Sequence, residues 1–181
     1  MKHMFQKINI VRLFLYGKRL HVRQIANLVG VSPASCMRYL QELEKDNILE
    51  SQKEGLQKVY AISLHRKAYH FVCLVEKFAS YTLLSHKDIA SLVYSLQGLY
   101  EILIIYGSFA KGTFHKNSDI DVVIIGGNKK KIDAILTTHV RTIQVEYCAL
   151  SHLSAKTALV TEIKNHHVVF GHVDAVVRLW L

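Results

Sequence analysis

Two short apolar runs constrain the fold of this chain more than any other feature. Residues 102–106 read Ile-Leu-Ile-Ile-Tyr, and residues 120–125 read Ile-Asp-Val-Val-Ile-Ile. Nearly continuous apolar segments of this length are typical of central strands that are covered on both faces. Helical spacing over 129–139 and 155–165, with an alternating pattern over 142–150, continues an order in which strands and helices alternate. The second half of the chain is therefore predicted to form a mixed α/β sheet.

The first third of the chain follows a different pattern. Apolar residues at helical spacing predict three helices, and a change to alternating residues then predicts a two-stranded hairpin. Ser32 suits an N-cap, and Pro33 suits the first helical position, where the N–H that proline lacks would have been unpaired. The predicted elements are helices that end at Gly17 and Gly30, a helix from Pro33, and strands over 48–52 and 57–62.

A helical stripe over 64–84 and a short helix over 88–96 connect the two parts. The chain has one proline and no Gly/Ser tract, so ordered structure must join its domains. We therefore predict a two-domain α/β (α+β) protein. Its predicted parts are an N-terminal domain over 1–64, connecting helices over 65–98 and a C-terminal domain over 99–181.

The sequence between the two apolar runs carries residues suited to phosphate chemistry. The first run ends at Gly107-Ser108, where a strand that turns into a short helix would expose backbone N–H groups beside a hydroxyl. Asp119 and Asp121 stand two residues apart, so their carboxylates project from one face of a strand. Two such carboxylates repel each other unless a cation lies between them, and hard oxygen ligands suit Mg²⁺ or Mn²⁺. A polar strand end without a ligand is the alternative.

A third acid, Glu146, lies on the predicted strand 142–147, where it shares a face with Gln144. It can face the aspartates if the two strands are neighbours, and a solvated strand face is the alternative. A P-loop is excluded, because Thr113 stands where that motif needs lysine and Lys111 precedes the second glycine.

The Gly107-Ser108 pair, a spacer of ten residues and Asp119-Ile120-Asp121 resemble the signature of the polymerase-beta-type nucleotidyltransferase superfamily, most of all its minimal nucleotidyltransferase branch. The resemblance spans residues 99–181. It implies transfer of a nucleoside monophosphate from an NTP to a hydroxyl, with two metal ions held by three carboxylates. The site residues that it implies are Gly107, Ser108 and Lys111 for the nucleotide, and Asp119, Asp121 and Glu146 for Mg²⁺ or Mn²⁺ and for catalysis.

Two functions follow from this resemblance. The first is an enzyme that attaches a nucleoside monophosphate to a protein or nucleic-acid hydroxyl. The second is a DNA-binding transcription regulator whose nucleotidyltransferase fold only binds nucleotide or mediates contacts. The paired aspartates favour the enzyme. The missing acceptor-holding domain and the attached N-terminal domain favour the regulator. The sequence departs from the family pattern at Lys111, where arginine is frequent, and at Glu146, where aspartate is commoner.

Residues 31–40, Val-Ser-Pro-Ala-Ser-Cys-Met-Arg-Tyr-Leu, resemble the recognition helix of winged helix-turn-helix DNA-binding domains, and the resemblance extends over 5–63. Such a helix fits the major groove with its N-terminal half toward base edges. A winged helix used only for protein contact is the alternative. The DNA contacts that the resemblance implies are base contacts from Ser35 and Arg38 and phosphate contacts from Lys53 and Lys58.

Charge and composition agree with polyanionic partners. The chain has 23 Lys and Arg against 14 Asp and Glu, a formal charge of +9, and ten basic but five acidic residues fall in 1–64. Three cysteines far apart, without a C-x-x-C pair, favour a reducing cytoplasm. No apolar run approaches the ~18 residues of a membrane span. We expect a cytoplasmic protein that binds DNA, an NTP and a protein or nucleic-acid acceptor but no membrane, and a two-fold homodimer would suit a helix-turn-helix reader.

Overall fold

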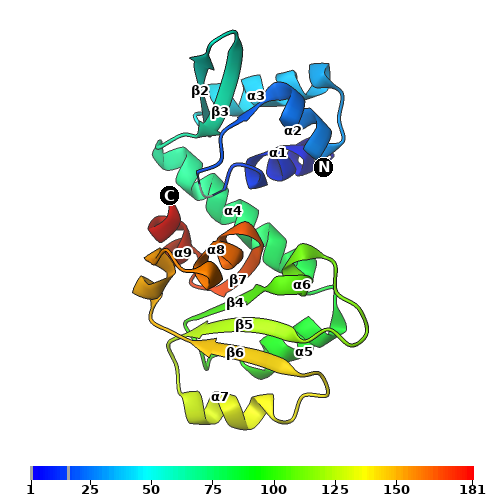
Figure 1. Cartoon of the computed structure of the whole chain (residues 1–181), viewed down its shortest axis with the longest axis vertical. Helices are drawn as coiled ribbons and strands as arrows, with labels where there is room; N and C mark the ends of the chain where they lie inside the picture. The colour runs from blue at the N-terminus through cyan, green and yellow to red at the C-terminus, as the bar shows by residue number, and fades with distance from the viewer. Residues whose placement is uncertain (1, 16) are drawn as a thin grey trace. The chain divides into compact units, whose positions relative to one another are not determined.

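The computed structural model describes residues 2–15 and 17–181 and divides into two compact units (Figure 1). The first unit runs to Val75 and includes Leu181, and the second is Glu76–Trp180. The change from one to the other falls inside helix α4 (Arg66–Leu83). Within the described residues, no helix is both long enough and apolar enough to cross a membrane.

The first unit is a helical domain with a small antiparallel sheet, as the sequence pattern predicts. Ser32 caps α3 by accepting a hydrogen bond from the Ser35 N–H at 3.2 Å, and Pro33 is the first helical residue. Strand β1, which the sequence pattern did not predict, adds to the hairpin, so the sheet order is β1-β3-β2. The elements are α1 (Lys2–Arg12), β1 (Leu20–His21), α2 (Val22–Val29), α3 (Pro33–Lys45), β2 (Leu49–Glu54) and β3 (Gln57–Ile62).

Helix α3 buries one face and exposes the other. Cys36, Leu40 and Leu43 are buried in the core of the first unit, whereas Arg38 and Gln41 are exposed. This division matches the spacing in the sequence and leaves the polar face of α3 open to a partner.

The second unit is built on a mixed sheet in the order β6-β5-β4-β7, in which β5 and β6 are parallel and the other pairs are antiparallel (Figure 1). This architecture confirms the predicted fold class. The elements are α5 (Lys87–Ser95), β4 (Ile102–Tyr106), α6 (Gly107–Lys111), β5 (Ile120–Ile125), α7 (Lys129–Leu136), β6 (Ile143–Tyr147), η1 (Leu150–Ser154), α8 (Ala158–Asn165), β7 (His167–Gly171) and α9 (Val173–Trp180).

The two faces of this sheet have different roles. One face packs Leu103, Ile105 and Val122 against the buried side chains of α5 and α7. The opposite face is also apolar and buried at Ile104, Val123 and Val169. At the end of β4, the strand registers place a row of polar residues on this second face, namely His167, Tyr106, Asp121 and Gln144. The sheet thus buries apolar residues on both faces and places Asp121 at one end of the second face.

Candidate functional site

The turn after β4 lies directly against Asp121. Tyr106, the last residue of β4, pairs with Asp121 of β5, and the chain then enters α6 at Gly107 with a φ of +65°. A Cβ atom at Gly107 would overlap Oδ2 of Asp121 and stand 3.0 Å from its Cγ. Glycine is therefore required here both by the left-handed backbone and by the adjacent carboxylate. The turn and the carboxylate form one site.

Asp121 lies among other acids. Partial burial raises the pKa of its carboxyl, and the charges of Glu162 and Asp119 raise that pKa further, whereas Lys111 lowers it. The Lys111 Nζ atom lies 2.9 Å from Oε1 of Glu162, which belongs to α8. Ionised carboxylates kept this close are stabilised by a cation, and Lys111 supplies only one positive charge.

The register of β5 and β6 decides which groups stand beside the aspartates. The two strands are neighbours, and Asp121 pairs with Gln144 while Val123 pairs with Glu146. Glu146 therefore shares the face of Asp121 but lies two residues further along the strand, about 6–7 Å at the usual rise. The Gln144 side chain donates a hydrogen bond to Oδ2 of Asp119 at 3.4 Å. The structure brings Asp119, Asp121 and Gln144 together, and Glu146 lies beyond them.

Asp119 and Asp121 fit a divalent ion that arrives with a substrate. Within residues 2–15 and 17–181, no three His, Cys, Asp or Glu side chains gather closely enough to hold a metal ion by themselves. Mg²⁺ is commonly bound by one or two carboxylates, with phosphate oxygens and water as its other ligands. Two aspartates beside a glycine turn whose N–H groups suit phosphate supply that kind of incomplete ligand set.

Sequence reasoning missed Glu162 as a member of this site. Glu162 lies more than forty residues after Asp121, in a helix whose position depends on the pairing of β7 with β4. No local motif marks it. Its contact with Lys111 also shows that the predicted nucleotide-binding lysine already has an anionic partner within the second unit.

The first unit presents its candidate DNA contacts on α3. Arg38 is exposed, and its guanidinium lies 5.4 Å from the centre of the Tyr39 ring. Ser35 is half-buried, and its Oγ accepts a hydrogen bond from the Ser32 hydroxyl at 3.0 Å. Ser35 therefore takes part in the helix cap and keeps its own O–H as a donor. Of the two predicted base contacts, Arg38 is the more accessible.

The β2–β3 hairpin, which is the wing of this domain, contains one candidate cation with an ion-pair partner and one without a partner in the part of the chain that the structure describes. Lys58 Nζ lies 2.8 Å from Oε2 of Glu44, so a DNA phosphate would have to compete with that carboxylate. Lys53 is exposed, and no ion pair involves it within the described residues. Lys53 is thus the wing lysine that is better placed to gain from a phosphate.

Comparisons with protein-family models match both parts of the chain. The nucleotidyltransferase domain matches residues 94–177, which include the Gly107 turn, both aspartates and Glu162. The winged helix-turn-helix DNA-binding family matches residues 7–50, which include α2 and α3. Comparisons with curated proteins and with solved structures return no match. The chain is a fusion of a winged helix-turn-helix DNA-binding domain with a nucleotidyltransferase domain.

Proposed function

We propose that the second unit binds an NTP with Mg²⁺ or Mn²⁺ and transfers a nucleoside monophosphate to a hydroxyl of a protein or nucleic acid. The observation that carries this proposal is the close approach of the Gly107 turn to the Asp121 carboxylate. It makes one site out of N–H groups that suit a polyphosphate and a carboxylate that suits its cation. The nucleotidyltransferase family match supports the same assignment.

In this proposal each residue of the site has a distinct role in binding the NTP or its cation. The N–H groups of the turn and the Ser108 hydroxyl bind phosphate oxygens, while Asp119 and Asp121 hold the cation. A cation held by these two carboxylates would supply positive charge to the triphosphate and to the attacking oxygen. Lys111 can add a positive charge to the nucleotide once it leaves Glu162. The acceptor hydroxyl loses its proton to water as its oxygen bonds to the α-phosphorus, and the bond from that phosphorus to pyrophosphate breaks.

Label transfer tests this proposal. The full chain is incubated with each α-phosphate-labelled NTP and Mg²⁺ or Mn²⁺, with and without DNA, and label is sought on protein and on nucleic acid. We expect transfer by the wild type, loss in Asp121→Ala, and no loss in Asp174→Asn, which changes an exposed acid in the first turn of α9. Equal labelling by the wild type and Asp121→Ala would refute the proposal.

A second candidate is a regulator that binds the nucleotide without transferring it. The observation that favours it is the register of β6, which puts the neutral Gln144 beside Asp121 and puts Glu146 further away. A third carboxylate at Glu146 is therefore the least supported of the three proposed metal ligands. Cation-dependent NTP binding with no label on any acceptor would favour this regulator.

We further propose that the first unit binds DNA through α3 and the wing. The winged helix-turn-helix match and the exposed Arg38 support this proposal. Arg38 and Ser35 would contact base edges, whereas Lys53 and Lys58 would contact phosphates. Selection of bound sequences from a random duplex pool tests it, and a pool that shows no enrichment would leave protein contact as the role of this unit.

A further inference from the structure

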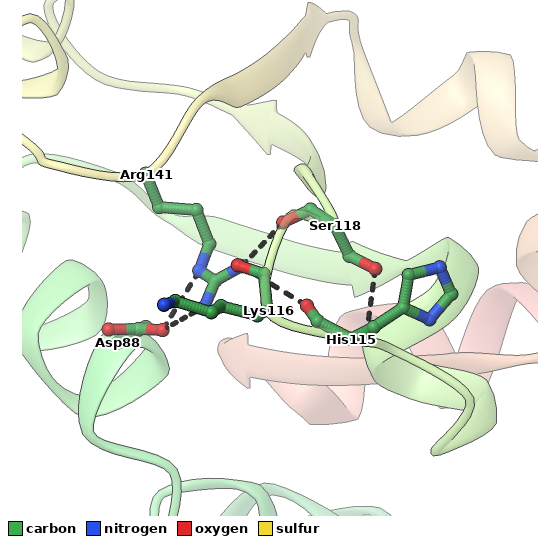
Figure 2. A network of polar contacts seen from close by, with 5 residues as sticks. All are labelled: Asp88, His115, Lys116, Ser118 and Arg141. Atoms are coloured by element: carbon green, nitrogen blue, oxygen red, sulfur yellow. Dashed lines mark hydrogen bonds and ion pairs between the residues drawn. The ribbon is translucent and has the colours of Figure 1, made fainter.

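Arg141 makes more polar contacts than any of the residues drawn with it in Figure 2, and sequence reasoning assigned it no role. It stands just before β6 and points toward the loop that leads into β5. Its Nη1 atom donates to the carbonyl oxygens of Ser118 at 2.7 Å, Lys116 at 2.8 Å and His115 at 3.4 Å. One guanidinium nitrogen therefore gathers three backbone carbonyls of a single loop.

That loop positions the first aspartate of the site. The Ser118 carbonyl belongs to the peptide that joins Ser118 to Asp119, so a hydrogen bond to it fixes the peptide plane directly before the Asp119 side chain. The Ser118 hydroxyl in turn accepts a hydrogen bond from the His115 N–H at 2.8 Å, which closes the loop on itself (Figure 2). Ile120, which follows Asp119, donates its N–H to the carbonyl of Thr142, the residue after Arg141.

The guanidinium is itself held in place from its other side. Its Nε and Nη2 atoms lie 2.8 and 2.7 Å from Oδ2 of Asp88, in the first turn of α5 (Figure 2). It also lies 5.4 Å from the centre of the Phe109 ring, one residue after Ser108 of the nucleotide turn. The Arg141 side chain is 20% exposed, so its charge is committed to these partners rather than to solvent.

We propose that Arg141 is a positioning residue, which holds Asp119 in the orientation that the cation and the NTP require. This inference rests on the proposed function of the second unit. Only arginine fits this position, because a planar fork with five donors can satisfy Asp88 on one edge and converging carbonyls on the other. A lysine would keep the charge but could not reproduce both sets of contacts. Arg141 acts through the loop backbone and does not itself touch the nucleotide.

The test measures binding and loop order separately, so that turnover is not the only readout. Mn²⁺ affinity in the presence of a non-hydrolysable NTP analogue is measured by electron paramagnetic resonance on the full chain. Hydrogen exchange reports the protection of residues 114–120. We expect Arg141→Ala to weaken Mn²⁺ binding at least tenfold and to raise exchange in the loop. We expect Arg141→Lys to recover less than half of that loss.

Two further variants separate positioning from loss of charge. Lys116→Ala removes an exposed positive charge from the same loop but keeps the backbone carbonyl that Arg141 binds, so we expect its Mn²⁺ affinity to stay within twofold of the wild type. Asp88→Asn removes the anionic brace and leaves every loop residue intact, so we expect a loss of about threefold. Asp88→Asn also keeps the inference testable if Arg141→Ala does not fold.

Three outcomes would overturn the inference. Arg141→Ala that binds Mn²⁺ and the analogue as the wild type does would remove the positioning role alone. Equal losses in Lys116→Ala and Arg141→Ala would assign the effect to charge. A wild type that fails to bind the Mn²⁺–analogue pair would overturn the proposed function together with this inference, whatever the hydrogen-exchange measurement shows.

Discussion

Replacement of Gly107 by alanine should damage both the stability and the nucleotide site of the second unit. An L-residue in the left-handed region costs about 1–2 kcal/mol, and the φ of Gly107 is +65°. The new Cβ would also overlap Oδ2 of Asp121, and forcing that carboxylate off its rotamer costs about 0.5–1.5 kcal/mol. The free energy of unfolding should therefore fall by about 1.5–3.5 kcal/mol, the sum of those ranges.

Gly112 provides a matched control at the other end of α6. Its φ is +72°, and among the described residues no heavy atom lies within 4 Å of the position that its Cβ would take. Gly112→Ala therefore bears the backbone cost alone. The difference between the two variants isolates the contact with Asp121, which we put at about 0.5–1.5 kcal/mol.

Urea unfolding followed by tryptophan fluorescence measures this difference. Trp180 is the only tryptophan of the chain, and its indole N–H donates to the Leu153 carbonyl at 3.0 Å, so the signal reports on the second unit. In an Asp121→Ala background, Gly107→Ala should cost no more than Gly112→Ala, because the overlapping oxygens are gone. An equal cost of Gly107→Ala in both backgrounds, or Gly107→Ala that binds NTP as the wild type does, would refute the reasoning.

Three further predictions concern charge. Asp121→Asn should raise the apo protein's stability at neutral pH by a few tenths to about 1 kcal/mol, because burial and the Glu162 and Asp119 charges raise the pKa of the wild-type carboxyl. That difference should vanish in thermal scans as the pH falls and the wild-type carboxyl is protonated. Arg38→Ala should reduce the discrimination between bases at one base pair by about 1–3 kcal/mol. Lys53→Ala should weaken binding to all sequences, and it should reduce the slope of log affinity against log salt concentration by about 1 in anisotropy titrations. Glu44→Gln frees Lys58 and should strengthen DNA binding with a steeper salt slope; an unchanged slope would show that Lys58 does not reach phosphate.

Local patterns were enough to predict much of this fold. The apolar runs at 102–106 and 120–125 became the buried strands β4 and β5, because segments without a polar face must be covered on both sides. Ser32 and Pro33 marked the start of α3, since cap chemistry depends on neighbours in sequence alone. The Gly107 turn and the Asp119-Ile120-Asp121 motif are also close in sequence, so they could be predicted to form one candidate site.

Features that depend on distant pairing could not be predicted in this way. The alternation in β6 gives Gln144 and Glu146 the same face, and only the register with β5 decides which of them stands beside Asp121. No helix or strand is predicted for residues 168–180 from the sequence, although 167–171 form a strand that completes the sheet beside β4. The Arg141 contacts join segments that lie 23 to 53 residues apart in sequence, and no periodicity encodes such a contact.

The most direct measurement is a crystal structure of the full chain grown with Mn²⁺ and a non-hydrolysable NTP analogue, with data collected at the manganese absorption edge. We predict an anomalous peak bound by the carboxylates of Asp119 and Asp121, with the analogue's phosphates against the Gly107-Ser108 turn. A peak held by other residues, or an analogue seated away from that turn, would contradict it.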